Sequence, residues 1–232
     1  KLHSYREMPE RFAETTMCYR DEQTGELHGI SRVRAFTQDD AHVFCRESQI
    51  KEEVYKVWDI VNTFYTAVGF GALKVRLSLH DPAQMEKYLG TKDVWEKTEG
   101  QLRELVKERG IEAIEAIGEA AMYGPKIDFI VKDAIGREWQ VATIQIDRNM
   151  PERFDLICIN EEGAHERIVM IHAAIMGSIE RFLSVFIEHC AGSFPLWLSP
   201  VQVSLLPVGE NFLVSARAFA DELQQGGIRV DV

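Results

Sequence analysis

The sequence feature that most constrains the fold is an alternation of side-chain types between Arg32 and Phe44. Alternate residues of a β-strand point to the same face, so the even-numbered positions would share one surface. These positions carry guanidinium, aromatic, amide, carboxylate and imidazole groups: Arg32, Arg34, Phe36, Gln38, Asp40, His42 and Phe44. The odd-numbered positions are mostly small or apolar, and only Asp39 is charged. The pattern predicts a strand whose odd face lies in the core and whose even face meets a ligand with anionic and polar parts.

Regular patterns around this strand predict an α+β fold with a largely antiparallel sheet flanked by helices. A strand over residues 10–20 would form a hairpin with it, joined by a loop over 21–31. Further elements follow from amphipathic spacing and from alternation: helices over 48–69 and 91–109, and strands over 73–79, 126–131 and 138–147. The last of these is apolar on both faces, so it should be central in the sheet. A long, nearly apolar run from His172 predicts a buried helix.

The composition of the chain changes near Gly192, which suggests a domain boundary. Residues 193–200 are rich in proline and aromatic residues and are typical of a linker. The remainder reads as a strand, a helix from about Glu210 to Gln225, and a second strand. One β-α-β unit leaves a sheet edge and a helix face uncovered, so the sequence predicts a first domain over 1–192 and an incomplete α/β domain over 193–232.

Charge and cysteine content limit the function classes. The 232 residues carry a formal net charge of −11, which argues against a protein that coats nucleic acid through charge alone. The four cysteines are widely spaced and form no CxxC pair, which favours a reduced, cytoplasmic protein. No segment reads as a signal peptide or a membrane span. Because the chain does not begin with Met, we expect it to be part of a longer protein.

Two arginines with acidic neighbours are candidates for anion binding. Arg20 lies two residues before Glu22 at a strand end, where a guanidinium can hold a phosphate or carboxylate. The alternative is a solvated ion pair between the two. Arg181 lies in an otherwise apolar segment and needs either an acidic residue or a ligand phosphate as its partner. Gly177, close by, fits either a flat ligand against the backbone or tight packing between elements.

Two histidines are candidates for metal ligands, although on spacing alone a hydrogen-bonded role is the simpler reading. His42 and His172 are too few for a zinc site, which needs at least three protein ligands. Cys45 has a tempting spacing to His42, but residues three apart on a strand face opposite sides, so we expect a core thiol. Asp40 shares the face of His42 and could orient it or bind substrate.

Other polar groups are expected near the rim of the sheet. Tyr123 and Lys126 flank a turn and offer a phenol and an ammonium group. Gln140, Thr143 and Gln145 interrupt an apolar strand with groups that need hydrogen-bond partners when buried. The sequence has no dinucleotide-binding or P-loop glycine motif, and no defensible Ser/His/Asp order.

Several of these segments resemble one enzyme family. Arg20-Asp-Glu22 resembles the second signature of class II aminoacyl-tRNA synthetases, and GSIERF at 177–182 resembles the third. The segments YRDEQTGELHGISRVRAFTQDDAHVFC, MYGPKIDF, WQVATIQID and VMIHAAIMGSIERF are similar to the threonyl-tRNA synthetase family in order and spacing. The resemblance covers most of residues 4–232 and implies a class II catalytic core that lacks its N-terminal part. The tail from Phe194 is similar to the start of that family's anticodon-binding domain.

The resemblance implies an ATP-dependent threonine–tRNA ligase and assigns roles to the candidate residues. Threonine would be activated to threonyl-adenylate and passed to the 3′ end of tRNA(Thr), mainly by positioning and charge neutralisation. Arg20 and Arg181 would be the catalytic residues, on the α-phosphate and on the γ-phosphate with Mg²⁺. The implied ATP-binding residues are Arg20, Glu22, Arg32, Phe36, Gln140, Thr143, Gly177 and Arg181. The implied substrate-binding residues are Gln38, Asp40, Tyr123, Lys126, Gln145 and Ser178.

The resemblance also implies a metal and an assembly. His42 and His172 would bind Zn²⁺, with the third ligand upstream of Lys1, and the metal and Asp40 would recognise the amino and hydroxyl groups of threonine. The full-length protein would be a homodimer with no membrane association.

Four residues differ from the family pattern: Ala35, Ala142 and Ala173 stand where Gly, Gly and Arg are expected, and His80 replaces an Arg. These differences motivate an alternative, a catalytically impaired paralogue that binds tRNA or a protein partner. A class II synthetase for serine, proline or glycine is a third reading.

Overall fold

A computed structural model describes residues 2–232 of the chain. Lys1, with which the predicted first domain begins, lies outside these residues. The chain forms two compact units, the first ending at His189 and the second beginning at Cys190. This division lies three residues before the predicted domain boundary. The assignment of the two units as a catalytic core and the start of an anticodon-binding domain stays a prediction.

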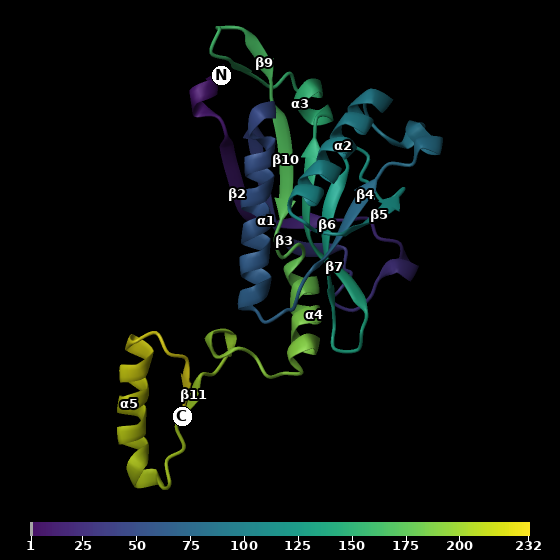
Figure 1. Cartoon of the computed structure of the whole chain (residues 1–232). Helices are drawn as coiled ribbons and strands as arrows, with labels where there is room; N and C mark the ends of the chain where they lie inside the picture. The colour runs from purple at the N-terminus through teal and green to yellow at the C-terminus, as the bar shows by residue number, and fades with distance from the viewer. Residues whose placement is uncertain (1) are drawn as a thin grey trace. The chain divides into compact units, whose positions relative to one another are not determined.

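The first unit is built on a seven-stranded sheet (Figure 1). Its strands, in spatial order, are β2 (Glu10–Tyr19), β3 (Ala35–Cys45), β10 (Val169–Ala174), β7 (Glu138–Asp147), β6 (Lys126–Lys132), β4 (Lys74–Leu79) and β5 (Ala113–Ile117). All neighbouring strands are antiparallel except β4 and β5. The predicted α+β class with a largely antiparallel sheet is confirmed, and β7 is the central strand as expected.

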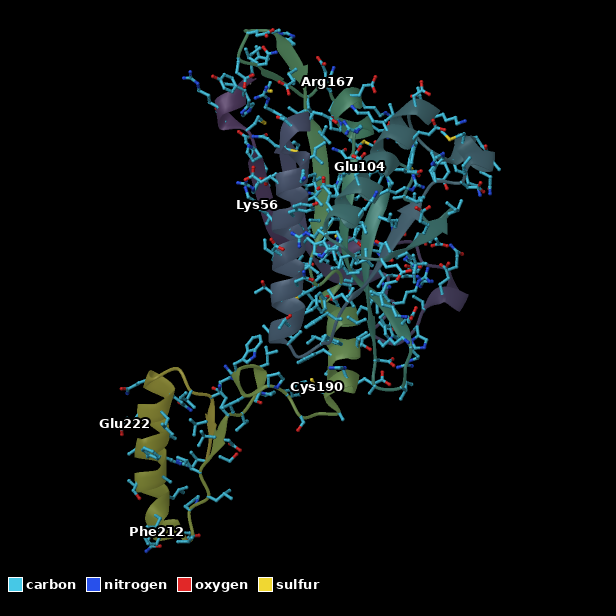
Figure 2. The ribbon with its side chains drawn as sticks, in the orientation of Figure 1. Lys56, Glu104, Arg167, Cys190, Phe212 and Glu222 are labelled. Carbon is cyan, nitrogen blue, oxygen red and sulfur yellow. The ribbon has the colours of Figure 1, made fainter. Side chains whose placement is uncertain are left out.

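Helices α1 (Ile50–Ala67) and α2 (Lys92–Glu108) cover one face of this sheet, α1 over β10 and β7 and α2 over β4 (Figure 1). The buried residues of α1 recur at helical spacing and include Val54, Trp58 and Val61, as an amphipathic helix requires. The ring of Trp58 meets the ring of Phe129 on β6 edge-on, with centroids 5.1 Å apart. Charged residues such as Lys56 on α1 are exposed (Figure 2).

The predicted helix from His172 is wrong over its first third. Val169–Ala174 form strand β10, a turn follows, and helix α4 begins only at Ile179 and ends at Cys190. The strand pairs with β3 on one edge and with β7 on the other, and all of its residues except His172 are apolar. A short apolar run of this kind cannot be distinguished from a buried helix by periodicity. Gly177, with φ of +69°, lies in the turn between the end of the strand at Ala174 and the start of the helix.

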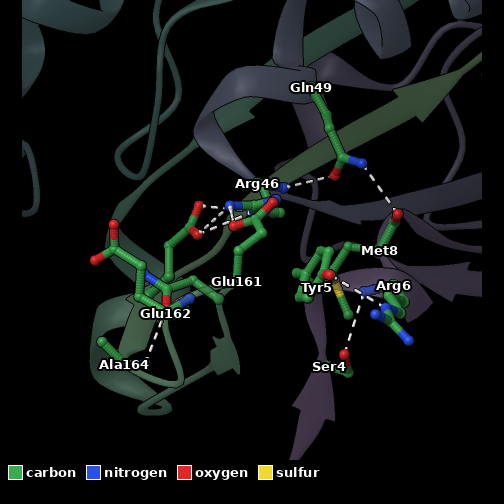
Figure 3. Close-up of polar contacts among 11 residues, drawn as sticks. Ser4, Tyr5, Arg6, Met8, Arg46, Gln49, Glu161, Glu162 and Ala164 are labelled. Atoms are coloured by element: carbon green, nitrogen blue, oxygen red, sulfur yellow. Dashed lines mark hydrogen bonds and ion pairs between the residues drawn. The ribbon is translucent and has the colours of Figure 1, made fainter.

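A small second sheet packs at one end of the first unit. It contains β1 (His3–Ser4), β8 (Ile157–Ile159) and β9 (His165–Arg167), and the short helix α3 (Asn149–Arg153) leads into it. Arg46, just after β3, donates hydrogen bonds to Glu161 and Glu166 at 2.7 Å, which ties this sheet to the large one. Figure 3 shows this arginine beside Gln49, whose side chain bridges the Arg46 amide and the Met8 carbonyl. Neither β8, β9 nor β5 was predicted.

The second unit is one β-α-β unit, as the sequence predicts. Strands β11 (Val203–Ser204) and β12 (Val230–Asp231) pair in parallel and are joined by α5 (Leu213–Gln225). Figure 2 marks Phe212, which precedes α5, and Glu222 near the end of that helix. Apolar side chains such as Leu206 and Val214 remain more than 80% exposed within the unit. No helix in residues 2–232 is long and apolar enough to cross a membrane.

Candidate active site

The face of the sheet opposite α1 and α2 contains a cavity of about 630 Å³. The even-numbered residues of β3 from Phe36 to His42 form one wall, as the alternation predicts. The strand begins at Ala35 and not at about Arg32, and Arg34 and Phe44, which were expected on the same face, do not line the cavity. Every residue predicted for the site lines this cavity: Arg20, Glu22, Arg32, Phe36, Gln38, Asp40, His42, Tyr123, Lys126, Gln140, Thr143, Gln145, His172, Gly177, Ser178 and Arg181. The structure therefore brings the candidates together, whereas their individual roles stay predictions.

One end of the cavity is rich in guanidinium groups. Arg181 donates from Nε to the Ser31 carbonyl at 2.8 Å, and within residues 2–232 it forms no ion pair. Burial lowers the pKa of Arg181, and the positive charges of Arg20 and Arg32 lower it further. Glu22 and Glu26 both pair with Arg32, which leaves the guanidinium groups of Arg20 and Arg181 without a carboxylate partner among residues 2–232. An anion such as a phosphate would relieve this repulsion.

Glu22 forms its ion pair with Arg32 and not with Arg20. Its Oε2 accepts from Arg32 Nε at 3.0 Å and lies 2.9 Å from Nη2. The hydrogen bond from Arg32 is the main reason that the pKa of Glu22 is lowered. The guanidinium of Arg20 instead lies over the ring of Phe36, 4.9 Å from its centroid. The alternative of a solvated Arg20–Glu22 pair is therefore wrong, and Arg20 faces the cavity without an acidic partner in the described chain.

A glycine is required at position 177 by backbone geometry. The residue has φ of +69°, and a Cβ atom there would lie 2.9 Å from the Val141 carbonyl oxygen on β7. Of the two explanations for this glycine, tight packing is thus sufficient. The same close approach brings the backbone of residues 176–178 to the edge of the cavity beside Phe36.

The floor of the cavity is organised by a buried carboxylate that the sequence reasoning missed. Asp128 on β6 is fully buried and accepts hydrogen bonds from Gln140 Nε2 at 2.8 Å and Thr143 Oγ1 at 2.9 Å. The ammonium of Lys126 lies 3.2 Å from the same carboxylate. These contacts satisfy Gln140 and Thr143 on β7, whereas Gln145 donates from Nε2 to the Gly124 carbonyl at 2.7 Å. The signal available in the sequence was the spacing of two between Lys126 and Asp128, which places them on one face of a strand.

The other end of the cavity contains the two histidines. His42 and His172 are directly opposite each other on β3 and β10, and their ring centroids are 4.8 Å apart. His172 Nε2 lies 2.9 Å from Asp147 Oδ2, and His42 Nδ1 lies 3.9 Å from Asp40 Oδ2. The ring of Tyr123 is 5.1 Å from that of His172. Burial raises the pKa of Tyr123, as do the charges of Asp147 and Asp40.

The two imidazoles fit a partial metal site. Metal-bound histidines usually donate their second nitrogen to a carboxylate, and Asp147 is placed to accept from His172. In residues 2–232, however, the only group of three possible ligands close enough for one ion is His3, Glu7 and Glu10, outside the cavity. Cys45 is fully buried, and burial raises its pKa to about 12, in agreement with the predicted core thiol.

The residues that depart from the family pattern are not all at the cavity. Ala142 is only 1% exposed and does not line the cavity, so its methyl group lies in the core and does not crowd a ligand. His80 is buried against Glu99, with Nδ1 2.6 Å from Oε1, also away from the cavity. Ala173 does line the cavity.

Comparison with known proteins agrees with this geometry. Residues 1–190 match the family model for the tRNA synthetase class II core domain (G, H, P, S and T). The chain belongs to this class II core-domain family.

Within the family, the chain is similar to threonine–tRNA ligases. That of Porphyromonas gingivalis is 54% identical over 99% of this chain, and that of Prosthecochloris aestuarii is 49% identical over all of it. The chain spans 35% of the length of each of these relatives.

Solved structures give the same result. The threonyl-tRNA synthetase of Cryptosporidium parvum Iowa II, described as its RNA binding domain, superposes with a TM-score of 0.92 at 39% identity. The match covers 99% of this chain and 56% of that one. A putative threonyl-tRNA synthetase from Aeropyrum pernix superposes with a TM-score of 0.80 at 35% identity. The match covers 96% of this chain and 52% of that one. A prolyl-tRNA synthetase from Giardia lamblia superposes with a TM-score of 0.68 at 17% identity, which shows a similar fold alone.

Proposed function

We propose that this chain is the catalytic core of a threonine–tRNA ligase, followed by the start of its anticodon-binding domain. The observation that carries the proposal is the polarity of the cavity along β3. The guanidinium of Arg20 lies over Phe36 at one end, with those of Arg32 and Arg181 close to it, and Asp40 and His42 lie with His172 at the other. The positive charge and the aromatic ring at the first end suit a nucleoside triphosphate. The carboxylate and imidazole groups at the second end suit a small amino acid with a hydroxyl group.

The proposed reaction needs no side-chain nucleophile. A carboxylate oxygen of threonine forms a bond to the α-phosphorus of ATP, and the bond to the bridging oxygen breaks to release pyrophosphate. A terminal ribose hydroxyl of tRNA(Thr) then attacks the threonyl carbonyl and AMP leaves. Arg20 would neutralise charge where the carboxylate and α-phosphate meet, and Arg181 would hold the γ-phosphate with Mg²⁺. Arg32, already paired with Glu22, would contact the phosphates or the tRNA end.

The nucleotide and the amino acid would be held by different walls. Phe36 and the backbone at Gly177 would enclose adenine, with Glu22 near its amino group. Gln38, Gln140, Thr143 and Gln145 would line the adenylate, with Lys126 and Ser178 at its sides. At the other end, Asp40 would accept a hydrogen bond from the hydroxyl group of threonine. Tyr123 would pack against threonine. A site built to bind the hydroxyl group discriminates strongly against valine, which lacks it.

Zn²⁺ is proposed at the histidine end, held by His42 and His172 with a third ligand from outside residues 2–232. When bound, it would act as a Lewis acid for the amino and hydroxyl groups of threonine. The proposed partners of the whole protein are tRNA(Thr), ATP and threonine, in a cytoplasmic homodimer.

Threonine-dependent exchange of pyrophosphate into ATP, measured with the intact protein and added Zn²⁺ and Mg²⁺, tests the proposal. We expect exchange with threonine, weaker exchange with serine and almost none with valine. Absence of exchange with all three, from folded and metal-replete protein, would overturn it. Retention of tRNA binding in that case would support the impaired paralogue.

A further inference from the structure

The turn between β10 and α4 is held by a carboxylate that does not line the cavity. Oδ2 of Asp39 accepts hydrogen bonds from the backbone amides of Ile175 and Met176, both at 2.9 Å, and Oδ1 accepts from Gly177 at 2.8 Å. Three consecutive amides that converge on one anion form a backbone nest. Asp39 therefore satisfies every donor of this turn before Ser178.

Two further contacts hold the same turn against neighbouring elements. The Asp39 amide donates to the Gly177 carbonyl at 3.3 Å, and the buried hydroxyl of Tyr65 on α1 donates to the Ile175 carbonyl at 2.9 Å. In the reverse direction, Glu180 on α4 accepts from the Thr37 amide on β3 at 2.8 Å. Two carboxylates thus join the turn and β3: Asp39 on β3 accepts from the turn, and Glu180, just after the turn, accepts from β3.

The position of this attachment relates it to the cavity. Gln38 and Asp40, the neighbours of Asp39 on β3, line the cavity, whereas Asp39 lies on the opposite face of the strand. The turn that it holds contributes Gly177 and Ser178 to the cavity wall and leads directly into Arg181. A shift of the turn would move these groups relative to Phe36.

We propose that Asp39 is a positioning residue that sets the nucleotide end of the cavity by anchoring the turn at 175–178. The nature of the ligand rests on the proposed function, whereas the anchoring rests on the hydrogen bonds alone. Asp39 does not contact substrate. It acts through the backbone that places Gly177, Ser178 and the first turn of α4.

A carboxylate is the group that this geometry requires. Three donors converge on two oxygens, and an ionised carboxylate has only acceptors. An asparagine would direct its own N–H₂ group at one of the three amides and leave that amide buried without an acceptor. Burial raises the pKa of Asp39, and the three backbone hydrogen bonds oppose that rise, as expected for a buried anion that is held by amides.

The test compares Asp39→Asn with Asp133→Asn in the intact protein. Asp133 is a buried carboxylate, whereas Asp39 is partly buried, and Asp133 also accepts two backbone amides, from Ile135 and Arg137, in the turn between β6 and β7. It does not line the cavity, so it controls for the general cost of removing such a charge. Binding of a non-hydrolysable ATP analogue with Mg²⁺, the KM for threonine and amide hydrogen exchange are measured for each.

We expect Asp39→Asn to weaken binding of the analogue roughly ten- to hundredfold, the range that one lost buried hydrogen-bond partner predicts. Exchange of the amides of residues 175–177 should accelerate. The KM for threonine should stay within about twofold, because the pairing of β3 with β10 and the contact of His172 with Asp147 hold the histidine end and are left in place. Asp133→Asn should change none of these. Tyr65→Phe keeps the aromatic packing, removes one hydrogen bond to the turn and should shift analogue binding in the same direction, by less.

Unchanged analogue affinity and unchanged exchange at 175–177 in Asp39→Asn would overturn the inference, as would equal effects of Asp133→Asn. If Asp39→Asn does not fold, Tyr65→Phe decides by the same two readouts. Failure of the wild-type protein to bind the analogue would instead overturn the proposed function. The amide-exchange contrast between the variants would still report whether Asp39 anchors the turn.

Discussion

Nε2 of His172 lies 2.9 Å from Oδ2 of the fully buried Asp147, the last residue of β7. The other oxygen of Asp147 accepts the amides of Asn149 and Met150 at 2.8 and 2.9 Å, so the carboxylate is fixed from both sides. A neutral His172 that donates from Nε2 leaves Nδ1 as its acceptor nitrogen. The tautomer of one of the two histidines in the cavity is therefore set by a residue that does not line it.

Replacement of Asp147 by Asn should release this constraint. We expect the KM for threonine to rise about ten- to hundredfold, the usual effect of losing a carboxylate behind a functional histidine. Affinity for ATP should change little, which is the reverse of the pattern expected for Asp39→Asn. The ¹⁵N chemical shifts of His172 should show a change of tautomer, and an unchanged tautomer with unchanged KM would contradict the assignment.

Replacement of Arg181 by Met should separate binding from stability. The methionine keeps much of the aliphatic packing, and no carboxylate in the described chain loses an ion pair. We therefore expect the free energy of unfolding in urea to change by less than about 1 kcal/mol. The value of kcat/KM for ATP should fall about 10²- to 10³-fold, as when a group that stabilises transition-state charge is removed.

Arg32→Met is the matched comparison, because it would leave the nearly buried Glu22 without its ion-pair partner. This variant should lose more stability than Arg181→Met. The opposite order would show that Arg181 is a structural cation.

Alanine at position 177 should be costly for two separable reasons. The positive φ angle disfavours any residue with a Cβ by about 1–2 kcal/mol, and the contact of 2.9 Å with the Val141 carbonyl adds to this. Gly136, in the β6–β7 turn, has φ of +86° and open space around it. Gly136→Ala should therefore show only the first cost, and chemical denaturation of both variants measures the difference. Equal losses would mean that the turn moves away from β7.

The stability of the protein should depend on pH through Asp133. Burial raises the pKa of this carboxyl, but hydrogen bonds from Trp139 and Arg137 outweigh burial and lower it to about 2, below its usual value of 3.8. A carboxyl with a lowered pKa stabilises the fold above the usual value, and this contribution is lost as the pH falls through the lowered one. Asp133→Asn should therefore be less stable than the wild type at pH 6, with the gap closing between about pH 4 and pH 2. A difference in stability that stays constant over that pH range would show that the pH dependence does not come from Asp133.

The alternation at 32–44 predicted the part of the cavity wall from Phe36 to His42, because period-two patterning places alternate residues of a strand on one face. It did not predict that the strand begins at Ala35 or that Arg34 and Phe44 lie outside the cavity. The amphipathic helices α1 and α2 and the central position of β7 followed from equally local signals. Strand β10 did not, because a short apolar run is compatible with a strand and with a buried helix, and only its pairing with β3 and β7 distinguishes the two.

The supporting carboxylates were missed for a related reason. Asp39 was visible only as a charge on an otherwise apolar face, and its partners are amides 136 to 138 residues further along. Asp128 and Asp147 likewise act on neighbours from other strands or on a following turn. Sequence periodicity identifies which face a residue occupies, whereas these contacts depend on how separate segments meet.

The attachment of the 175–178 turn has a kinetic consequence. Asp39, Tyr65 and Glu180 hold the turn through contacts within the chain that need no ligand, so its conformational entropy should be lost during folding and not during binding. Association with a nucleotide then requires no slow ordering of this segment. The encounter is governed instead by two opposing fields, a net charge of −11 that repels an anion at long range and the guanidinium groups that attract it close to the cavity. The rate of entry should therefore depend on ionic strength, because added salt screens the long-range repulsion more than the attraction close to the cavity.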